Sequence, residues 1–205
     1  MKFAFLLYEG VEPIDLAAIG VISMARRVMP ALSYLTVAHD TGLQLFANGL
    51  RVAPDASFDD CPAVDAIIVP GGPGWPQASE NAVIRSFLQR RSADAVLISV
   101  CTGAMILAAA GLLDGRTATT KCEVRPPEVS PLALLTRDHP GIDARKALVV
   151  DAGSVVTGGG VSLCIDAILH VLATRIGAEE AAEVARIIEY GHAWEANKAR
   201  LPTFA

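Results

Sequence analysis

The chain has 205 residues, of which 52% are hydrophobic and 19% charged, a balance that excludes intrinsic disorder and allows one domain with a substantial core. Its formal net charge is −5 and it has no run of Lys and Arg, so neither a nucleic acid nor a membrane surface is an expected partner. Residues 95–113 are uncharged, but Ser99, Thr102 and Gly103 divide a β-branched half from an Ala- and Leu-rich half. This change of character predicts a buried strand followed by a buried helix, and not a membrane span.

The chain begins with a short apolar run that is interrupted by Glu9, Glu12 and Asp15, with no small-residue cleavage site after it. A buried first strand therefore fits better than an export signal, and a cytoplasmic location with reduced thiols is expected. The four cysteines form no CxxC pair, so neither a metal site nor a redox dithiol is expected. They are Cys61, Cys101, Cys122 and Cys164.

Strand-like apolar runs alternate with helical patterns along the chain. Strands are expected at residues 2–8, 33–39, 66–69, 95–100, 116–120, 146–150 and 154–157, and a hairpin with an Asn48-Gly49 turn at 43–53. Helices are expected at residues 14–28, 80–91 (after a Ser79 N-cap), 102–110, 162–176 and, as the last one, 178–190. The alternation predicts an α/β fold in one domain over residues 1–205, with a mostly parallel sheet covered by helices on both faces.

Three loops follow the carboxyl ends of expected strands, at residues 9–15, 70–75 and 101–103. Ligands bind beyond the carboxyl ends of the strands in sheets of this kind. We therefore expect the polar residues of these loops to form one site for a small-molecule substrate.

Cys101 stands where the strand at 95–100 passes directly into a helix that begins with small residues. Such a turn strains the backbone and projects the side chain into the mouth of a site, and a helix N-terminus would lower the pKa of the thiol. The alternative is a buried structural cysteine. The position at the turn favours a nucleophile.

The loop after the strand at 66–69 contains Gly71, Gly72 and Trp75. Paired glycines at a strand end can expose N–H groups that bind an anion or an oxyanion, although most glycine loops are simple turns. Asp15 lies at the first strand-to-helix junction, where two interpretations are open. It interacts with the start of the helix, or it faces Cys101 as a protonated carboxyl that moves a proton. The positions of the four histidines do not predict a Cys–His pair.

Four segments in order resemble the ThiJ/PfpI family, which belongs to the class I glutamine-amidotransferase-like superfamily: GVEPIDLAAIG, VPGGPG, VCTGAMILAAAGLLDGRTATT and VVTGGGVSLCIDAIL. The resemblance covers nearly the whole chain and implies a flavodoxin-like three-layer sandwich with a cysteine nucleophile elbow. Within the family, Cys-Thr-Gly at the elbow and Asp in the first loop are most similar to isonitrile hydratases. A homodimer is also implied.

The resemblance implies that Cys101 attacks the terminal carbon of an isonitrile, that Asp15 moves the protons, and that water releases an N-substituted formamide. Thr102 and Gly72 would contact the reacting atoms, and no cofactor or metal would take part. One departure is that these hydratases carry His-Trp where this chain has Lys121-Cys122. Substrate scope, or the reaction itself, therefore depends on whether that segment lines the site.

Three other functions stay open: a related carbon–nitrogen hydrolase or lyase, a redox sensor in which Cys101 is oxidised to sulfenic or sulfinic acid, and the ligand-sensing half of a regulator. Regulators of this family carry a helix-turn-helix extension. Nothing basic follows the last expected helix, so direct binding of DNA is not expected.

Overall fold

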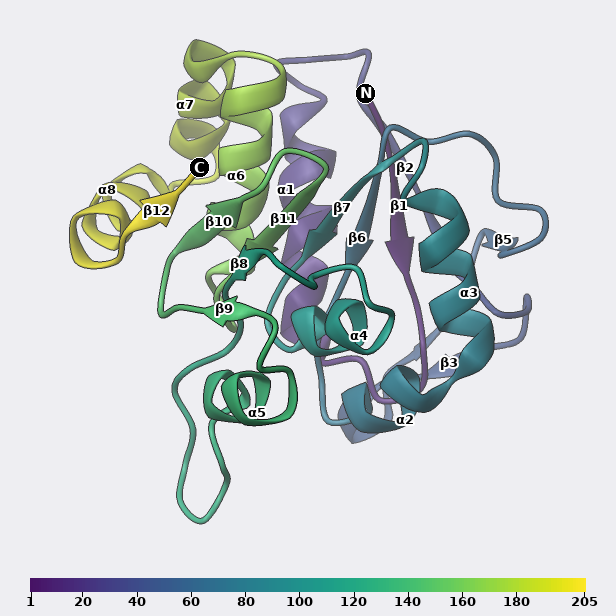
Figure 1. Cartoon of the computed structure of the whole chain (residues 1–205). Coiled ribbons are helices and arrows are strands. Elements are labelled where there is room, and N and C mark those ends of the chain that lie inside the picture. Colours follow the sequence, from purple (N-terminus) through teal and green to yellow (C-terminus); the bar gives the residue numbers. More distant parts are fainter.

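The computed structural model describes residues 1–205 and has an eight-stranded sheet at its centre (Figure 1). The strand order is β12-β10-β11-β7-β6-β1-β2-β5. The bounds are β1 Lys2–Leu6, β2 Ser33–Ala38, β5 Ala56–Ser57, β6 Ala66–Val69, β7 Val96–Ser99, β10 Val149–Asp151, β11 Val155–Gly158 and β12 Thr203–Phe204. All pairs are parallel except β10 with β11, so the predicted mostly parallel sheet is confirmed.

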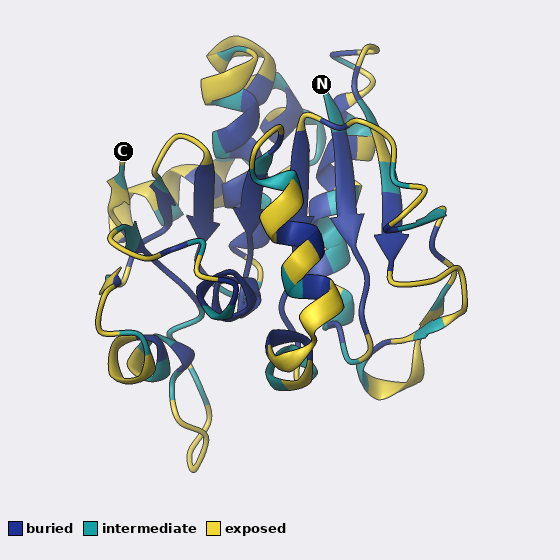
Figure 2. Ribbon diagram, turned by 45° about the vertical axis from the view of Figure 1, so that its right-hand side comes forward, coloured by how far each residue is buried: buried dark blue, intermediate teal, exposed yellow.

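Helices cover both faces of this sheet. On one face, α1 (Ala17–Ala25) packs on α6 (Cys164–Arg175) and α7 (Ala178–Ile187). On the other face, α2 (Trp75–Glu80), α3 (Ala82–Arg91) and α4 (Gly103–Ala109) pack together. The alternating colours of α3 in Figure 2 show one buried and one exposed side, whereas α4 is buried over nearly its whole length. The three layers share one core cluster of 55 buried residues.

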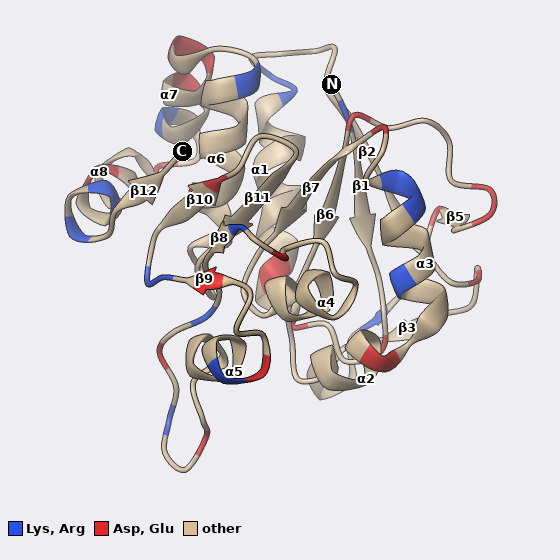
Figure 3. Ribbon diagram, in the orientation of Figure 1, with Lys and Arg blue, Asp and Glu red and all other residues tan.

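Most charged residues lie at the periphery of this arrangement, although Asp15 and Asp166 are buried (Figure 3). Within the eight strands of the sheet, charged residues occur only at two strand ends, Lys2 and Asp151. A parallel sheet with helices on both faces buries its strands on both sides, which explains their continuous apolar runs.

The predicted start of the helix at residues 80–91 is wrong, because α3 begins at Ala82. Two helices occupy this region, and Asn81 between them is the N-cap of α3, because its Oδ1 accepts hydrogen bonds from the N–H groups of Val83 and Ile84 at 2.9 and 3.3 Å. Ser79 lies inside α2, where its hydroxyl is buried without a partner. The Asn81 side chain fills the capping role that had been expected of Ser79.

Several further elements differ from expectation. The first helix is divided into a 3₁₀ turn, η1 (Pro13–Leu16), and α1. The hairpin of β3 (Gln44–Leu45) and β4 (Arg51–Val52) has a longer connection than the two-residue turn expected, which includes the 3₁₀ turn η2 (Ala47–Gly49). The strand expected at 116–120 is β8 (Thr117–Ala118), which pairs with β9 (Asp143–Ala144) outside the main sheet.

Besides α2, two further helices were not expected. They are α5 (Pro131–Asp138), inside a Pro-containing stretch, and α8 (Gly191–Arg200), which follows the helix that had been expected to be the last. The segment that connects β8 to α5 projects from the body of the molecule (Figures 1 and 2). No helix combines the length and the apolar composition that a membrane crossing requires.

Candidate active site

Cys101 occupies the predicted elbow between β7 and α4. Its φ of 52° lies in the left-handed region, which a non-glycine residue enters only at a cost. Three backbone-directed hydrogen bonds hold this geometry: the Cys101 N–H donates to Gly159 O at 3.2 Å, and Cys101 O accepts from the Thr120 hydroxyl at 2.8 Å and from the Lys121 N–H at 3.3 Å. Cys101 is buried, with 3% of its surface exposed, and these hydrogen bonds hold its strained backbone in place.

The glycine loop approaches the elbow closely. A Cβ at Gly71 would lie 2.8 Å from Cys101 Cβ and would collide with the Thr102 backbone N–H, which explains why this position has no side chain. The Gly71 N–H donates to Asp15 Oδ2 at 2.7 Å, and the Gly72 N–H donates to Thr102 Oγ1 at 3.0 Å. Both amides therefore have partners within the protein. The open oxyanion hole expected from Gly71 and Gly72 is not present in this arrangement, and their role is to tie the three loops together.

Asp15 is fully buried on η1, with one carboxylate oxygen bound and one free of partners. Its Oδ2 accepts from Gly71, whereas Oδ1 has no hydrogen-bond partner. Burial raises the pKa of Asp15 to about 7, although the Gly71 N–H lowers it in part, and the charge of Glu12 raises it further. Asp15 lies in the first turn of η1, as one of the two interpretations expected, but its side chain makes no capping hydrogen bond. A buried carboxyl with an unused oxygen near neutral pKa is suited to accept and return a proton.

The expected lowering of the Cys101 pKa is also wrong. Burial, and next the negative charge of Asp15, raise the pKa of the thiol to about 12, although Thr102 and the Lys121 charge lower it in part. The start of α4 does stabilise the thiolate, through the Thr102 N–H, but burial outweighs that contribution. Cys101 and Asp15 are thus electrostatically coupled: at neutral pH the thiol keeps its proton, whereas Asp15 is close to the midpoint of its titration.

Tyr8 supports the glycine loop that follows β6, a role that was not predicted from the sequence. Its buried hydroxyl donates to Pro70 O at 3.0 Å, and the charges of Asp15 and Cys101 add to burial in raising its pKa. The signal in the sequence was a tyrosine at the end of an expected strand, where the ring can be buried while the hydroxyl reaches a loop carbonyl.

A cavity of about 500 Å³ opens over the thiol. Its lining residues are Glu12, Ile14, Gly72, Pro73, Trp75, Cys101, Thr102, Lys121, Glu128 and Val161. Four predicted residues, Gly72, Trp75, Cys101 and Thr102, line it, whereas Asp15 and Gly71 are buried and are not among the lining residues. Sequence reasoning had left open whether Lys121 would reach the site, and it had not singled out Ile14, Glu128 or Val161.

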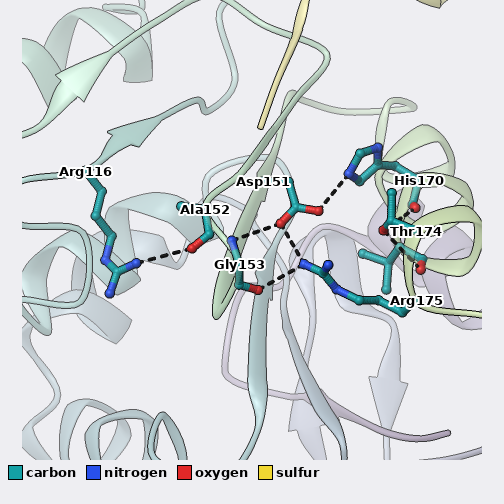
Figure 4. Close-up of polar contacts among 8 residues, drawn as sticks. Arg116, Asp151, Ala152, Gly153, His170, Thr174 and Arg175 are labelled. Carbon is teal, nitrogen blue, oxygen red and sulfur yellow. Dashed lines mark hydrogen bonds and ion pairs between the residues drawn. The ribbon is translucent and has the colours of Figure 1, made fainter.

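The remaining cysteines and the histidines lie outside the cavity lining. Cys164 is buried close by, with its Sγ 3.9 Å from Ile14 O, and burial first and the charge of Asp15 second raise its pKa. No group of three or more His, Cys, Asp and Glu side chains is arranged to hold a metal ion. His170 pairs instead with Asp151, in a separate cluster that Figure 4 shows together with Arg175.

Known proteins are similar to this chain in both sequence and fold. Residues 1–174 match the DJ-1/PfpI family. Over 194 residues the chain is 31% identical to isonitrile hydratase of Pseudomonas putida, which covers 94% of this chain and 80% of that protein. It is also 31% identical over 195 residues to the HTH-type transcriptional regulator GbdR of Pseudomonas aeruginosa, covering 92% of this chain but only half of the regulator.

The fold agrees with solved structures of the same family. A THiJ/PfpI family protein from Pseudomonas syringae superposes with a TM-score of 0.79 at 28% identity, covering 92% of this chain and 74% of that one. The overall architecture described above is therefore shared with that protein. The chain belongs to the DJ-1/PfpI family.

Proposed function

We propose that this protein is a cysteine-dependent hydratase that adds water to the terminal carbon of an isonitrile and releases an N-substituted formamide. The observation that carries the proposal is the coupling of Cys101, at a strained elbow on the cavity wall, to a fully buried Asp15 with a pKa of about 7. The 31% identity to an isonitrile hydratase over 94% of the chain supports the same reaction.

The first half of the reaction joins the thiol to the substrate. Cys101 Sγ attacks the terminal carbon as its proton passes to Asp15, and Asp15 returns that proton to the same carbon. A C–S bond and a C–H bond form, the S–H bond breaks, and the product is a thioimidate in which carbon and nitrogen share a double bond. The reaction does not require a free thiolate at rest, since a carboxylate with a pKa of about 7 can accept the thiol proton during the attack.

The second half adds water to the thioimidate. The water oxygen attacks the carbon, one of its protons reaches the nitrogen, and Asp15 accepts the other. The C–S bond then breaks, and the sulfur recovers its proton from Asp15. One isonitrile and one water therefore give one formamide, with no net oxidation or reduction.

Turnover of a simple aliphatic isonitrile tests the proposal directly. We expect wild type to form the formamide, and Cys101→Ser to form none, by proton NMR. In D₂O the formyl carbon of the product should carry deuterium, because the thiol proton exchanges with solvent before it is transferred. Cys61→Ser is the matched control, since Cys61 lies outside the cavity. Wild type that forms no formamide contradicts the proposal.

The likeness to GbdR favours a second candidate, a binding protein without turnover. A thiol whose pKa is raised to about 12 is a poor target for oxidants at neutral pH, so redox sensing receives less support. An isonitrile that binds to wild type with no formamide formed would favour the binding protein over the hydratase.

A further inference from the structure

The cavity over Cys101 has one positively charged side chain in its wall. Lys121 follows Thr120, whose hydroxyl binds Cys101 O, and the Lys121 N–H donates to the same carbonyl. The lysine backbone is therefore fixed against the elbow. Its side chain is 18% exposed and lines the cavity.

The ammonium of Lys121 is only partly satisfied by the protein. Its Nζ donates to Glu123 O at 2.5 Å, and Glu128 Oε1 lies 3.7 Å away, beyond hydrogen-bonding distance. A lysine ammonium has three protons to donate. At least one of them therefore remains for a carboxylate oxygen of a ligand.

Glu128 already brings a carboxylate towards this ammonium. Its side chain is 56% exposed, and it lies on the segment that projects between β8 and α5 (Figures 1 and 2). An exposed ion pair at this separation contributes little, so a ligand that binds at shorter distance can replace it. Glu128 thus marks where a ligand carboxylate can be bound.

The other lining residues limit how such a ligand can lie. Ile14, Pro73, Trp75 and Val161 offer apolar contact, while Glu12 adds a negative charge on the side of Asp15. Repulsion from Glu12 would turn an anionic group towards Lys121. The charge of Lys121 also lowers the pKa of Cys101 in part, so the ammonium acts on the sulfur from within the same site.

We propose that Lys121 selects substrates that carry a carboxylate near the reacting carbon, and that this carboxylate replaces Glu128 at the ammonium. The inference rests on the proposed function, under which the substrate class is an isonitrile with a carboxylate substituent. It gives Lys121 a specificity-determining role at the position where the sequence departs from the His-Trp expected of a hydratase.

Alkylation of Cys101 tests the charge preference without any isonitrile. Iodoacetate and iodoacetamide are close in size and differ in charge, and the ratio of their rates at Cys101 can be measured by peptide mass spectrometry. A change in the pKa of the thiol affects both reagents alike and cancels in the ratio. We expect Lys121→Met to lower the iodoacetate-to-iodoacetamide ratio about tenfold, and Lys121→Arg to preserve most of it.

Glu128→Gln should raise the same ratio, because it removes the competing carboxylate. Cys61 in the same samples provides an internal reference whose ratio does not change. An unchanged ratio in Lys121→Met overturns the inference.

Binding of product-like formamides gives a second measurement that does not depend on thiol reactivity. N-formylglycine should bind more tightly than N-formylglycinamide to wild type by calorimetry, and Lys121→Met should abolish the difference. Equal binding to wild type contradicts the inference.

Turnover of isocyanoacetate and its methyl ester separates this inference from the proposed function. Hydration of both at equal kcat/KM in wild type and in Lys121→Met overturns the role of Lys121 and leaves the hydratase standing. Turnover of neither, together with the ratio shift at Cys101, overturns the hydratase and supports the carboxylate site.

Discussion

Two aspartates at opposite edges of the sheet have opposite electrostatics. Asp15 lies beyond the carboxyl ends of the parallel strands with one oxygen unpartnered, whereas Asp151 ends β10 at the other edge with both oxygens bound (Figure 4). Asp151 Oδ2 contacts His170 Nε2 at 3.0 Å, and Oδ1 accepts from Arg175 at 2.7 Å and from the Gly153 N–H at 3.0 Å.

The two pKa values follow from these partners. Burial raises both, but at Asp151 the hydrogen bonds of His170 and Gly153 and the charge of Arg175 outweigh it, and the net pKa is lowered. At Asp15 a single amide opposes burial, and the pKa rises to about 7. A satisfied carboxylate holds structure together, while an unsatisfied buried one costs stability and keeps an oxygen available for chemistry.

Replacing Asp15 should produce the largest change. We expect Asp15→Asn to lower kcat/KM for an isonitrile about 10²- to 10⁴-fold, because the amide cannot accept the thiol proton. At pH 8 the variant should be at least as stable as wild type, since it removes a buried charge. Urea unfolding with activity in parallel measures both. Unchanged kcat/KM would show that Asp15 takes no part in the reaction and differs from Asp151 only in its electrostatics.

The pH dependence of stability should differ in sign at the two sites. Folded Asp15 retains its proton up to about pH 7, whereas the unfolded chain loses it near the ordinary value of 3.8. Its ionisation therefore costs stability as pH rises from about 4 to 7, by at most about 4 kcal/mol, and the cost is constant above that range. Asp151 stabilises the fold above its ordinary pKa, and this contribution is lost as pH falls through the lowered folded value.

Urea unfolding from pH 3 to 8 would resolve these two effects. Wild type should lose stability relative to Asp15→Asn between about pH 4 and 7. It should gain stability relative to Asp151→Asn between pH 3 and 5. A stability difference between wild type and Asp15→Asn that is independent of pH would show that burial does not raise the pKa of Asp15.

Asp151→Asn should affect stability alone. The loss of the contacts with His170 and Arg175 is expected to cost about 1–3 kcal/mol in the free energy of unfolding at pH 7. The activity of the remaining folded protein should equal that of wild type, because Asp151 lies outside the cavity. A kcat/KM reduced by more than about threefold would mean that the two edges of the sheet communicate.

Tyr8→Phe should have the smallest effect. It tests whether Tyr8 only supports the glycine loop or also takes part in proton exchange. It removes the hydroxyl that donates to Pro70 O while leaving the buried ring, so we expect a stability loss of about 1 kcal/mol. Because that bond supports the loop that bears Gly71, kcat should fall only modestly, with no shift in the pH profile. A shifted profile would place Tyr8 among the groups that exchange the proton.

The sequence determined the parts of this protein that local chemistry governs. The strand over residues 66–69 matches β6, because apolar β-branched runs with a glycine stop are specific local signals. The elbow at Cys101 was predicted for a similar reason, since a strand of branched residues meets a helix of small ones there. Asp15 was selected because its loop had to end at the same edge of the sheet.

Only the tertiary structure decided how these groups are satisfied. Gly71 and Asp15 are 56 positions apart, and their hydrogen bond both fixes the loop and closes the expected oxyanion hole. The burial that raises the pKa values of Asp15 and Cys101 comes from packing of segments distant in the chain, so no local pattern reports it. The same holds for Lys121, which lines the cavity because its backbone is bound to Cys101 O across a gap of 20 residues.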